Sequence, residues 1–170
     1  GASKTSEVLC ENNMAILKLL SEEVFEFSKD QMTTDKIKTM KEGLTHEFQQ
    51  IFELCDYILE RSQKPQLLVV TLQTLLRFLQ WIPLRFVFET KMIEQLLTKF
   101  LPRIEFRNDT IRCLTEVGSL SVTGAQYDTI FQKMYAHLMG QLATALSPET
   151  NIAAAFEAGT ERDEHFVQAL

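Results

Sequence analysis

The chain has 170 residues, of which 45% are hydrophobic and 24% are charged, and its formal net charge is −6 at pH 7. Its low content of glycine (6) and proline (4) argues against long linkers and against a loop-rich β fold. The acidic balance argues against nucleic acid as the main ligand, although residues 65–112 form a mildly basic middle stretch. We therefore expect an all-α protein.

No segment of the sequence predicts insertion into a membrane. The longest apolar run, residues 67–82, is interrupted by Arg77 and Gln80, whereas a spanning helix needs roughly 20 apolar residues. The opening residues 1–3 are typical of a cloning scar. We expect residues 4–170 to be a single run of helices cut from a longer protein and truncated at both ends.

Apolar residues that recur every three to four positions predict the helices. The first is expected over residues 6–28, and a longer one over 32–61 after a short loop. In chain order, the later helices are expected at 65–82, 89–101, 107–119, 123–146, 148–158 and 160–170.

The helix between Pro65 and Pro83 is apolar on nearly every side, which predicts that neighbouring helices cover both of its flanks. Pro65 suits a first helical turn, and Pro83 cannot continue the helix inward. The remaining polar residues fall three to four positions apart and share one narrow stripe, formed by Gln66, Gln73, Arg77 and Gln80. We expect this stripe alone to meet solvent or a partner.

The apolar pattern of the chain repeats. Residues 71–78 match residues 110–117 at an offset of 39 positions, and the helices that precede them match at an offset of 42. Helix pairs that recur about every 40–47 residues are typical of HEAT and armadillo solenoids, in which each pair stacks on the next. We therefore expect about three to four HEAT repeats built from antiparallel helix pairs; a helical bundle is the structural alternative.

The sequence predicts no catalytic site, cofactor site or metal site. His46, His137 and His165 are each without a convincing second ligand one helical turn away, and no glycine-rich phosphate loop is present. The three cysteines are far apart and belong to no pairing motif, which indicates reduced thiols: Cys10, Cys55 and Cys113. We expect a protein that is not an enzyme.

Several stretches resemble one family. They are LKLLSEEVFEFS (17–28), TLQTLLRFLQWIPL (71–84), FETK (88–91), KFL (99–101), FRN (106–108) and CLTEV (113–117). They are similar to the exportins of the importin-β, or karyopherin, superfamily that carry leucine-rich nuclear export signals. The similarity covers nearly the whole chain and places it in the N-terminal half of such a receptor.

This resemblance implies a nuclear export receptor that shuttles between nucleus and cytoplasm through the nuclear pore. It implies cooperative binding of Ran in its GTP state and of export-signal cargo, and contacts with nucleoporins. The export-signal groove and the inhibitor-reactive cysteine of the family belong to later repeats, which this chain does not contain. The segment is therefore expected to supply part of the receptor wall and inner-surface contacts.

In the family, the second helix of each pair faces the inside of the ring. If helices 65–82 and 107–119 are second helices, the residues expected on the inner surface are Gln73, Arg77, Arg112 and Glu116. These four are candidate partner contacts. The alternative for each is a solvated polar position on a helix.

Two further alternatives remain open at the level of sequence. The chain fits a HEAT or armadillo scaffold that joins two proteins outside nuclear transport, and dependence on Ran separates this function from export. A piece of a solenoid also lacks the polar caps of terminal repeats. We therefore expect self-association through the helices nearest residues 6–28 and 161–170.

Overall fold

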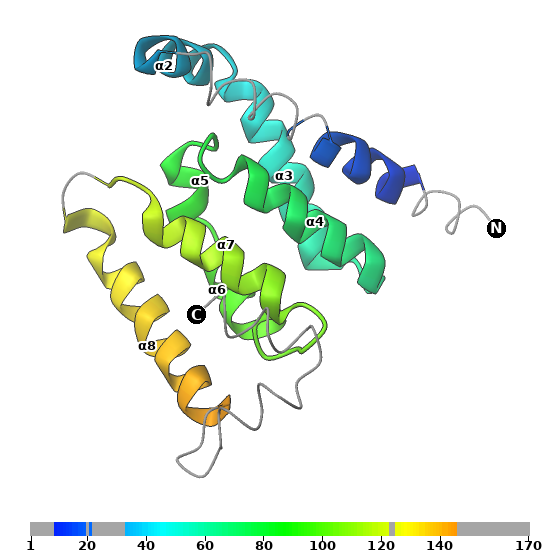
Figure 1. Ribbon diagram of the computed structural model, residues 1–170, viewed down its shortest axis with the longest axis vertical. Helices are drawn as coiled ribbons and strands as arrows, with labels where there is room; N and C mark the ends of the chain where they lie inside the picture. Colours follow the sequence, from blue (N-terminus) through cyan, green and yellow to red (C-terminus); the bar gives the residue numbers. More distant parts are fainter. Residues whose placement is uncertain (1–8, 20, 22–32, 123–124, 146–170) are drawn as a thin grey trace. The chain divides into compact units, whose positions relative to one another are not determined.

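The computed structural model describes residues 9–19, 21, 33–122 and 125–145 (Figure 1). Their regular structure is helical throughout, which confirms the all-α prediction. The chain divides into two compact units, Gly1–Thr90 and Lys91–Leu170. No helix in the described ranges is both long enough and apolar enough to cross a membrane.

The first unit is built on an antiparallel helix pair, α3 (Thr45–Arg61) and α4 (Pro65–Phe78), which lie side by side in Figure 1. The three residues between them are a connection length typical of antiparallel helix hairpins. Pro65 takes the first helical position, where its missing N–H would have no intrahelical partner. The pair buries five side chains of α3 and seven of α4, so the expectation that α4 is a core helix is confirmed.

Aromatic side chains close the end of this pair where α4 stops. The Phe48 ring on α3 lies 6.1 Å from the ring of Phe78 and 5.8 Å from that of Trp81, between centroids. Phe52, also on α3, lies 5.5 Å from Phe86 of the short helix α5 (Leu84–Phe88). Trp81 is therefore a buried packing residue of the corner after α4.

Three polar contacts join the first described helix, residues 9–19, to α4 and to Lys64, the residue that precedes α4. The Lys64 ammonium lies 2.6 Å from the Glu11 carboxylate, and the Lys18 ammonium donates to Gln73 Oε1 at 2.9 Å. The hydroxyl of the buried Thr74 lies 3.2 Å from the Met14 carbonyl oxygen and 2.8 Å from the Val70 carbonyl oxygen of its own helix, and it shares its one hydrogen between these two acceptors. These contacts fix which side of the first helix faces α4.

Replacing Thr74 with valine is expected to lower the free energy of unfolding by about 0.5–1.5 kcal/mol, because it removes a buried hydroxyl that is shared between the Val70 carbonyl oxygen of its own helix and the Met14 carbonyl oxygen of the first helix, while keeping the side-chain shape. Thr98→Val is the matched control, since the Thr98 hydroxyl is exposed and bonds only within its own helical turn, to the Glu94 carbonyl oxygen at 2.8 Å. Urea unfolding measures both. Equal losses for the two variants would contradict a bond between the helices.

The second unit contains the corresponding pair. Its first helix combines α6 (Met92–Gln95) with η1 (Leu96–Phe100), a π-helical turn in which the Leu101 N–H donates to the Leu96 carbonyl oxygen at 2.9 Å. Its second helix is α7 (Arg107–Ser119), which lies against η1 and buries five of its residues. A 3₁₀ turn, η2 (Ala125–Tyr127), then leads into α8 (Asp128–Ala145), which also contacts η1.

Several predicted boundaries are wrong. The helix expected over 32–61 is two helices, α2 (Thr34–Gly43) and α3, because the backbone breaks at Leu44 beside a glycine, a residue that costs about 1 kcal/mol in a helix interior. The helix expected over 65–82 ends at Phe78. The helix expected over 89–101 begins at Met92 and changes to π geometry.

Other boundaries are confirmed. The helix over 107–119 is α7 at the predicted positions, and α8 follows the predicted course from 128 to 145. The helices predicted over 148–158 and 160–170 lie outside the described residues.

Candidate functional site

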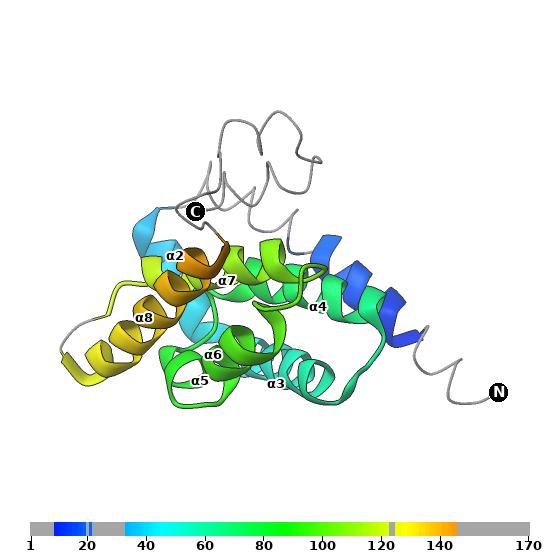
Figure 2. The same ribbon diagram turned by 90° about the horizontal axis from the view of Figure 1, so that it is seen from below.

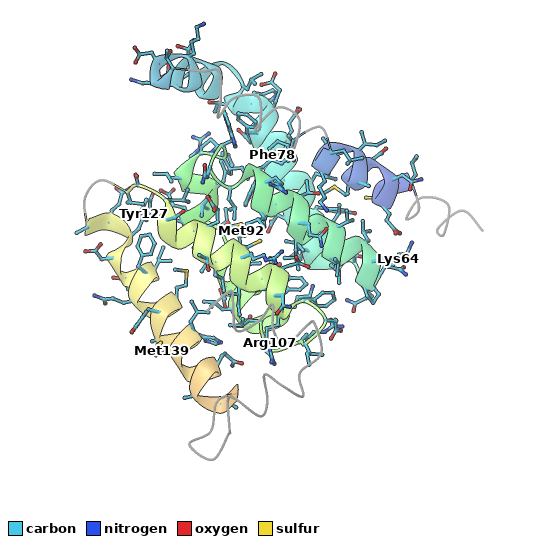
Figure 3. The ribbon with its side chains drawn as sticks, in the orientation of Figure 1. Lys64, Phe78, Met92, Arg107, Tyr127 and Met139 are labelled. Atoms are coloured by element: carbon cyan, nitrogen blue, oxygen red, sulfur yellow. The ribbon has the colours of Figure 1, made fainter. Side chains whose placement is uncertain are left out.

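The four residues of the predicted polar stripe differ in their surroundings, and Gln80 lies beyond the end of α4 at Phe78. The stripe is not alone in reaching solvent, because Val69, Val70 and Leu76 are half-buried like Gln73. Gln66, Arg77 and Gln80 are exposed, whereas Gln73 is half-buried because its amide oxygen accepts the hydrogen bond from Lys18. Gln73 therefore already works as a contact between two helices of its own unit. Figure 3 marks the two ends of this helix at Lys64 and Phe78.

The candidate contacts on α7 are Arg112, which is exposed, and Glu116, which is half-buried. They lie four residues apart, so they share one face of the helix. The structure thus brings Gln73 and Arg77 together on α4, and Arg112 and Glu116 together on α7. The two pairs belong to separate units.

Three basic residues of the mildly basic stretch 65–112 pack against aromatic rings. Guanidinium and ammonium groups lie over neighbouring rings: Arg85 over Phe86 at 4.8 Å, Lys99 over Phe100 at 5.2 Å and Arg103 over Phe106 at 4.5 Å from the ring centroid. Cation–π contacts of this kind contribute about 0.5–1 kcal/mol at exposed sites. At these three positions the positive charge therefore stabilises the packing of the fold's corners.

Arg107, at the start of α7 (Figure 3), is a fourth basic residue with a structural role, because its side chain binds backbone carbonyl groups. Its guanidinium donates to the carbonyl oxygens of Leu101 and Pro102 at 3.3 and 3.4 Å. Carbonyl groups at the end of a helix have no intrahelical donor, and a cation there also suits the helix dipole. Sequence reasoning missed this role, because the partners are backbone atoms across a turn.

The cysteines show no sign of a reactive site. Cys55 and Cys113 are buried, Cys10 is half-buried, and all three are free thiols, as predicted. Burial raises the pKa of Cys55 to about 12, with smaller contributions from Asp56 and Cys10. A thiol with so high a pKa stays protonated at neutral pH, and the thiolate is the nucleophilic form.

In the native chain, iodoacetamide at pH 8 is expected to modify Cys10 and to leave Cys55 and Cys113 unmodified, because only Cys10 is partly accessible. Burial also raises the pKa of Cys10, so its labelling should be slower than that of a free thiol and should accelerate as the pH rises. Peptide mass spectrometry locates the label. Modification of Cys55 at the rate of Cys10 would contradict the buried placement.

Within the described ranges, no three His, Cys, Asp or Glu side chains gather in a way that could hold a metal ion. His46, on the surface of α3, has its ring nitrogen 3.2 Å from the amide nitrogen of Gln50 one turn along the same helix. The polar groups of the described part thus form helix surfaces and corners.

The chain is similar to known proteins along its whole length. The family model described as Exportin 1-like protein matches residues 1–114. The chain is 49% identical to the protein EXPORTIN 1A of Arabidopsis thaliana over 169 residues, which are 99% of this chain and 16% of that protein. It is 47% identical to Exportin-1 of Schizosaccharomyces pombe over 99% of its length and 48% identical to Exportin-1 of Drosophila melanogaster over 100%, again 16% of each relative.

The chain therefore spans about one-sixth of the length of these relatives. The resemblance expected from the quoted stretches is confirmed, and it extends over the helix pairs of both units. The family model covers α3, α4 and most of α7, and it includes the candidate contacts Gln73, Arg77 and Arg112 but not Glu116. The chain belongs to the exportin 1-like family.

Proposed function

We propose that the chain is a segment of a nuclear export receptor that binds leucine-rich export-signal cargo together with Ran-GTP and carries the cargo from nucleus to cytoplasm. The observation that carries this proposal is the 47–49% identity, over 99% of the chain or more, to proteins named exportin in a plant, a fungus and an insect. The receptor would shuttle through the nuclear pore and meet nucleoporins there.

The segment would act as part of the receptor wall. Each unit holds its own buried core, formed by the α3–α4 pair in the first and by η1 with α7 in the second. In a solenoid, stability is spread over repeats and their nearest-neighbour interfaces, so many weak contacts share a change of curvature. Cooperative binding of Ran-GTP and cargo needs a coupling free energy of only about 1–3 kcal/mol, which such a deformation supplies.

Replacing the matching segment of Schizosaccharomyces pombe Exportin-1 with this chain tests the proposal in cells. A reporter protein with a leucine-rich export signal should be excluded from the nucleus by the hybrid receptor, as it is by the parent. Immunoblotting and a thermal melt of the purified hybrid establish that it is produced and folded. Nuclear accumulation of the reporter with a stable, folded hybrid would refute the proposal.

The candidate contacts are tested by charge reversal in the same receptor. Arg77→Glu and Arg112→Glu should each weaken assembly with Ran-GTP by roughly tenfold or more if these exposed cations meet the partner, because a like charge then faces it. Arg61→Glu is the control, since Arg61 is an exposed cation on α3, the other helix of its pair. Unchanged assembly of both variants would mean that Arg77 and Arg112 are solvated helix positions.

A further inference from the structure

The helix α3 carries exposed apolar side chains on the side away from its core. Leu54 is 36% exposed and Tyr57 is 57% exposed, although five other residues of the helix are buried. At about 100° per residue, Tyr57 lies about 180° from Phe48 and about 160° from Cys55, two of the buried residues. Figure 1 and Figure 2 both show α3 and α4 side by side, and Tyr57 belongs to the opposite, unburied side of α3.

Charged residues surround the two apolar side chains. The exposed residues over 53–61 all fall within an arc of about 120° of the helix surface: Glu53, Leu54, Tyr57, Glu60 and Arg61. We call this surface the outer face of α3. It combines an aliphatic and an aromatic side chain with carboxylates on both sides of them along the helix.

The chain's own Arg61 shows which group this surface accepts. Its guanidinium lies 5.0 Å from the centroid of the Tyr57 ring, and its Nε lies 4.0 Å from the Glu60 carboxylate. A cation is attracted by the face of an aromatic ring as well as by a carboxylate. Because Tyr57 keeps 57% exposure beside Arg61, a large part of its side chain still meets solvent.

Carboxylates outnumber cations on α3. The helix contains four acidic residues, whereas Arg61 is its one lysine or arginine. Burial and, next, the Glu60 carboxylate raise the pKa of the half-buried Asp56, which lies one turn before Glu60. Like charges at this spacing repel each other on a helix, so a cation that binds between them lowers the repulsion. The charge of the outer face therefore complements a basic partner.

We propose that the outer face of α3 is a docking surface for a basic segment of another protein, in which lysine or arginine side chains flank an aliphatic one. The aliphatic side chain contacts Leu54 and Tyr57, and the flanking cations meet Glu53 and Glu60. An apolar centre supplies most of the affinity of such an interface, and the charges at its rim select the partner. This docking surface is separate from the candidate contacts with Ran-GTP, which lie on α4 and α7.

The test uses the full-length hybrid of Schizosaccharomyces pombe Exportin-1 that carries this chain, with an excess of export-signal peptide to fill the export-signal groove. The probe is the synthetic peptide Lys-Lys-Leu-Leu-Lys-Lys, in which one leucine is replaced by photo-leucine. Irradiation expels nitrogen from the photo-leucine, and the carbene that remains inserts into a neighbouring bond; peptide mass spectrometry locates the adduct. We expect adducts within residues 50–61 at a peptide concentration well below saturation. The same peptide with glutamate in place of lysine should give at least roughly fivefold fewer.

Variants of the receptor separate docking from non-specific attraction. Tyr57→Ala should lower the yield of the α3 adduct roughly fivefold or more, whereas Tyr57→Phe should retain it because the ring is kept. Glu53→Lys should lower the yield to a similar extent, and its control is Glu94→Lys, which reverses an exposed carboxylate on α6 and should leave the yield unchanged. Thermal melts establish that the variants are folded.

Three results would overturn the docking surface. They are the absence of adducts on α3, equal yields for Tyr57→Ala and the parent, and equal yields for the basic and the acidic peptide. The first would show that another part of the receptor covers Tyr57 or that the surface binds no basic segment. None of these results depends on whether the receptor binds Ran-GTP, so the test stands apart from that of nuclear export.

Discussion

Leu75→Ala is expected to lower the free energy of unfolding of the first unit by about 2–5 kcal/mol. Leu75 is 1% exposed and lies in the last turns of α4, the helix that the first helix and α3 both contact. Truncation removes the transfer free energy of the lost methyl groups and leaves a cavity that helices on two sides can only partly close. This is a large part of the stability of a typical domain.

Fluorescence of Trp81 follows this unfolding directly, because Trp81 is the one tryptophan of the chain and packs against Phe48 in the same unit. Gln66→Ala is the control on the same helix, and it should change the free energy by no more than about 0.5 kcal/mol because Gln66 is exposed. A loss below about 1 kcal/mol for Leu75→Ala would contradict the placement of α4 in the core.

Phe100→Ala is expected to destabilise the second unit by about 3–5 kcal/mol. Phe100 is 0% exposed at the end of the π-helical turn, and its ring meets the ring of Phe106 edge to face, with centroids 5.5 Å apart. An aromatic pair of this geometry contributes about 0.5–1.5 kcal/mol beyond the area it buries. The expected loss of stability therefore has three sources: the cavity, the lost contact with the Phe106 ring and the lost cation–π contact with Lys99.

Ile104→Ala provides the comparison for Phe100→Ala, because Ile104 lies in the same corner but is 59% exposed. Its truncation should change stability by no more than about 0.5 kcal/mol. The second unit contains no tryptophan, so its unfolding in urea is followed as the part of the circular dichroism change, which includes the helices of both units, that Trp81 fluorescence of the first unit does not report. Similar losses for the two variants would show that Phe100 does not fill a core.

The sequence predicts α7 and the start of α4 well because the signals there are local. Pro65 marks a first turn, and the apolar period of 107–119 is unbroken. The short helix α5 is missed, because Pro83 is interpreted as a stop although it also precedes a helix start, with φ of −55°. The π turn at 96–100 is missed because a single turn of i→i−5 hydrogen bonds is too short to be distinguished from an α-helical turn by the spacing of its apolar residues.

For the candidate contacts, too, the sequence predicts what depends on local spacing and misses what depends on contacts between distant residues. The shared face of Gln73 and Arg77 is predicted from their spacing, which is a property of one helix. The hydrogen bond from Lys18 to Gln73 joins residues 55 positions apart, and no local pattern reveals it. The apolar residues of the first helix are likewise visible in the sequence, but only the structure shows that Met14 is buried while Leu9 and Leu19 are exposed.

The central claim is that this segment belongs to a receptor in which Ran-GTP and cargo bind cooperatively. The most direct measurement is the affinity of the Exportin-1 hybrid that carries this chain for a labelled export-signal peptide, with and without Ran loaded with a non-hydrolysable GTP analogue. We predict roughly 5–150-fold tighter peptide binding with Ran, as a coupling of about 1–3 kcal/mol requires. Equal affinity with and without Ran, in a folded hybrid whose parent shows the coupling, would contradict this account.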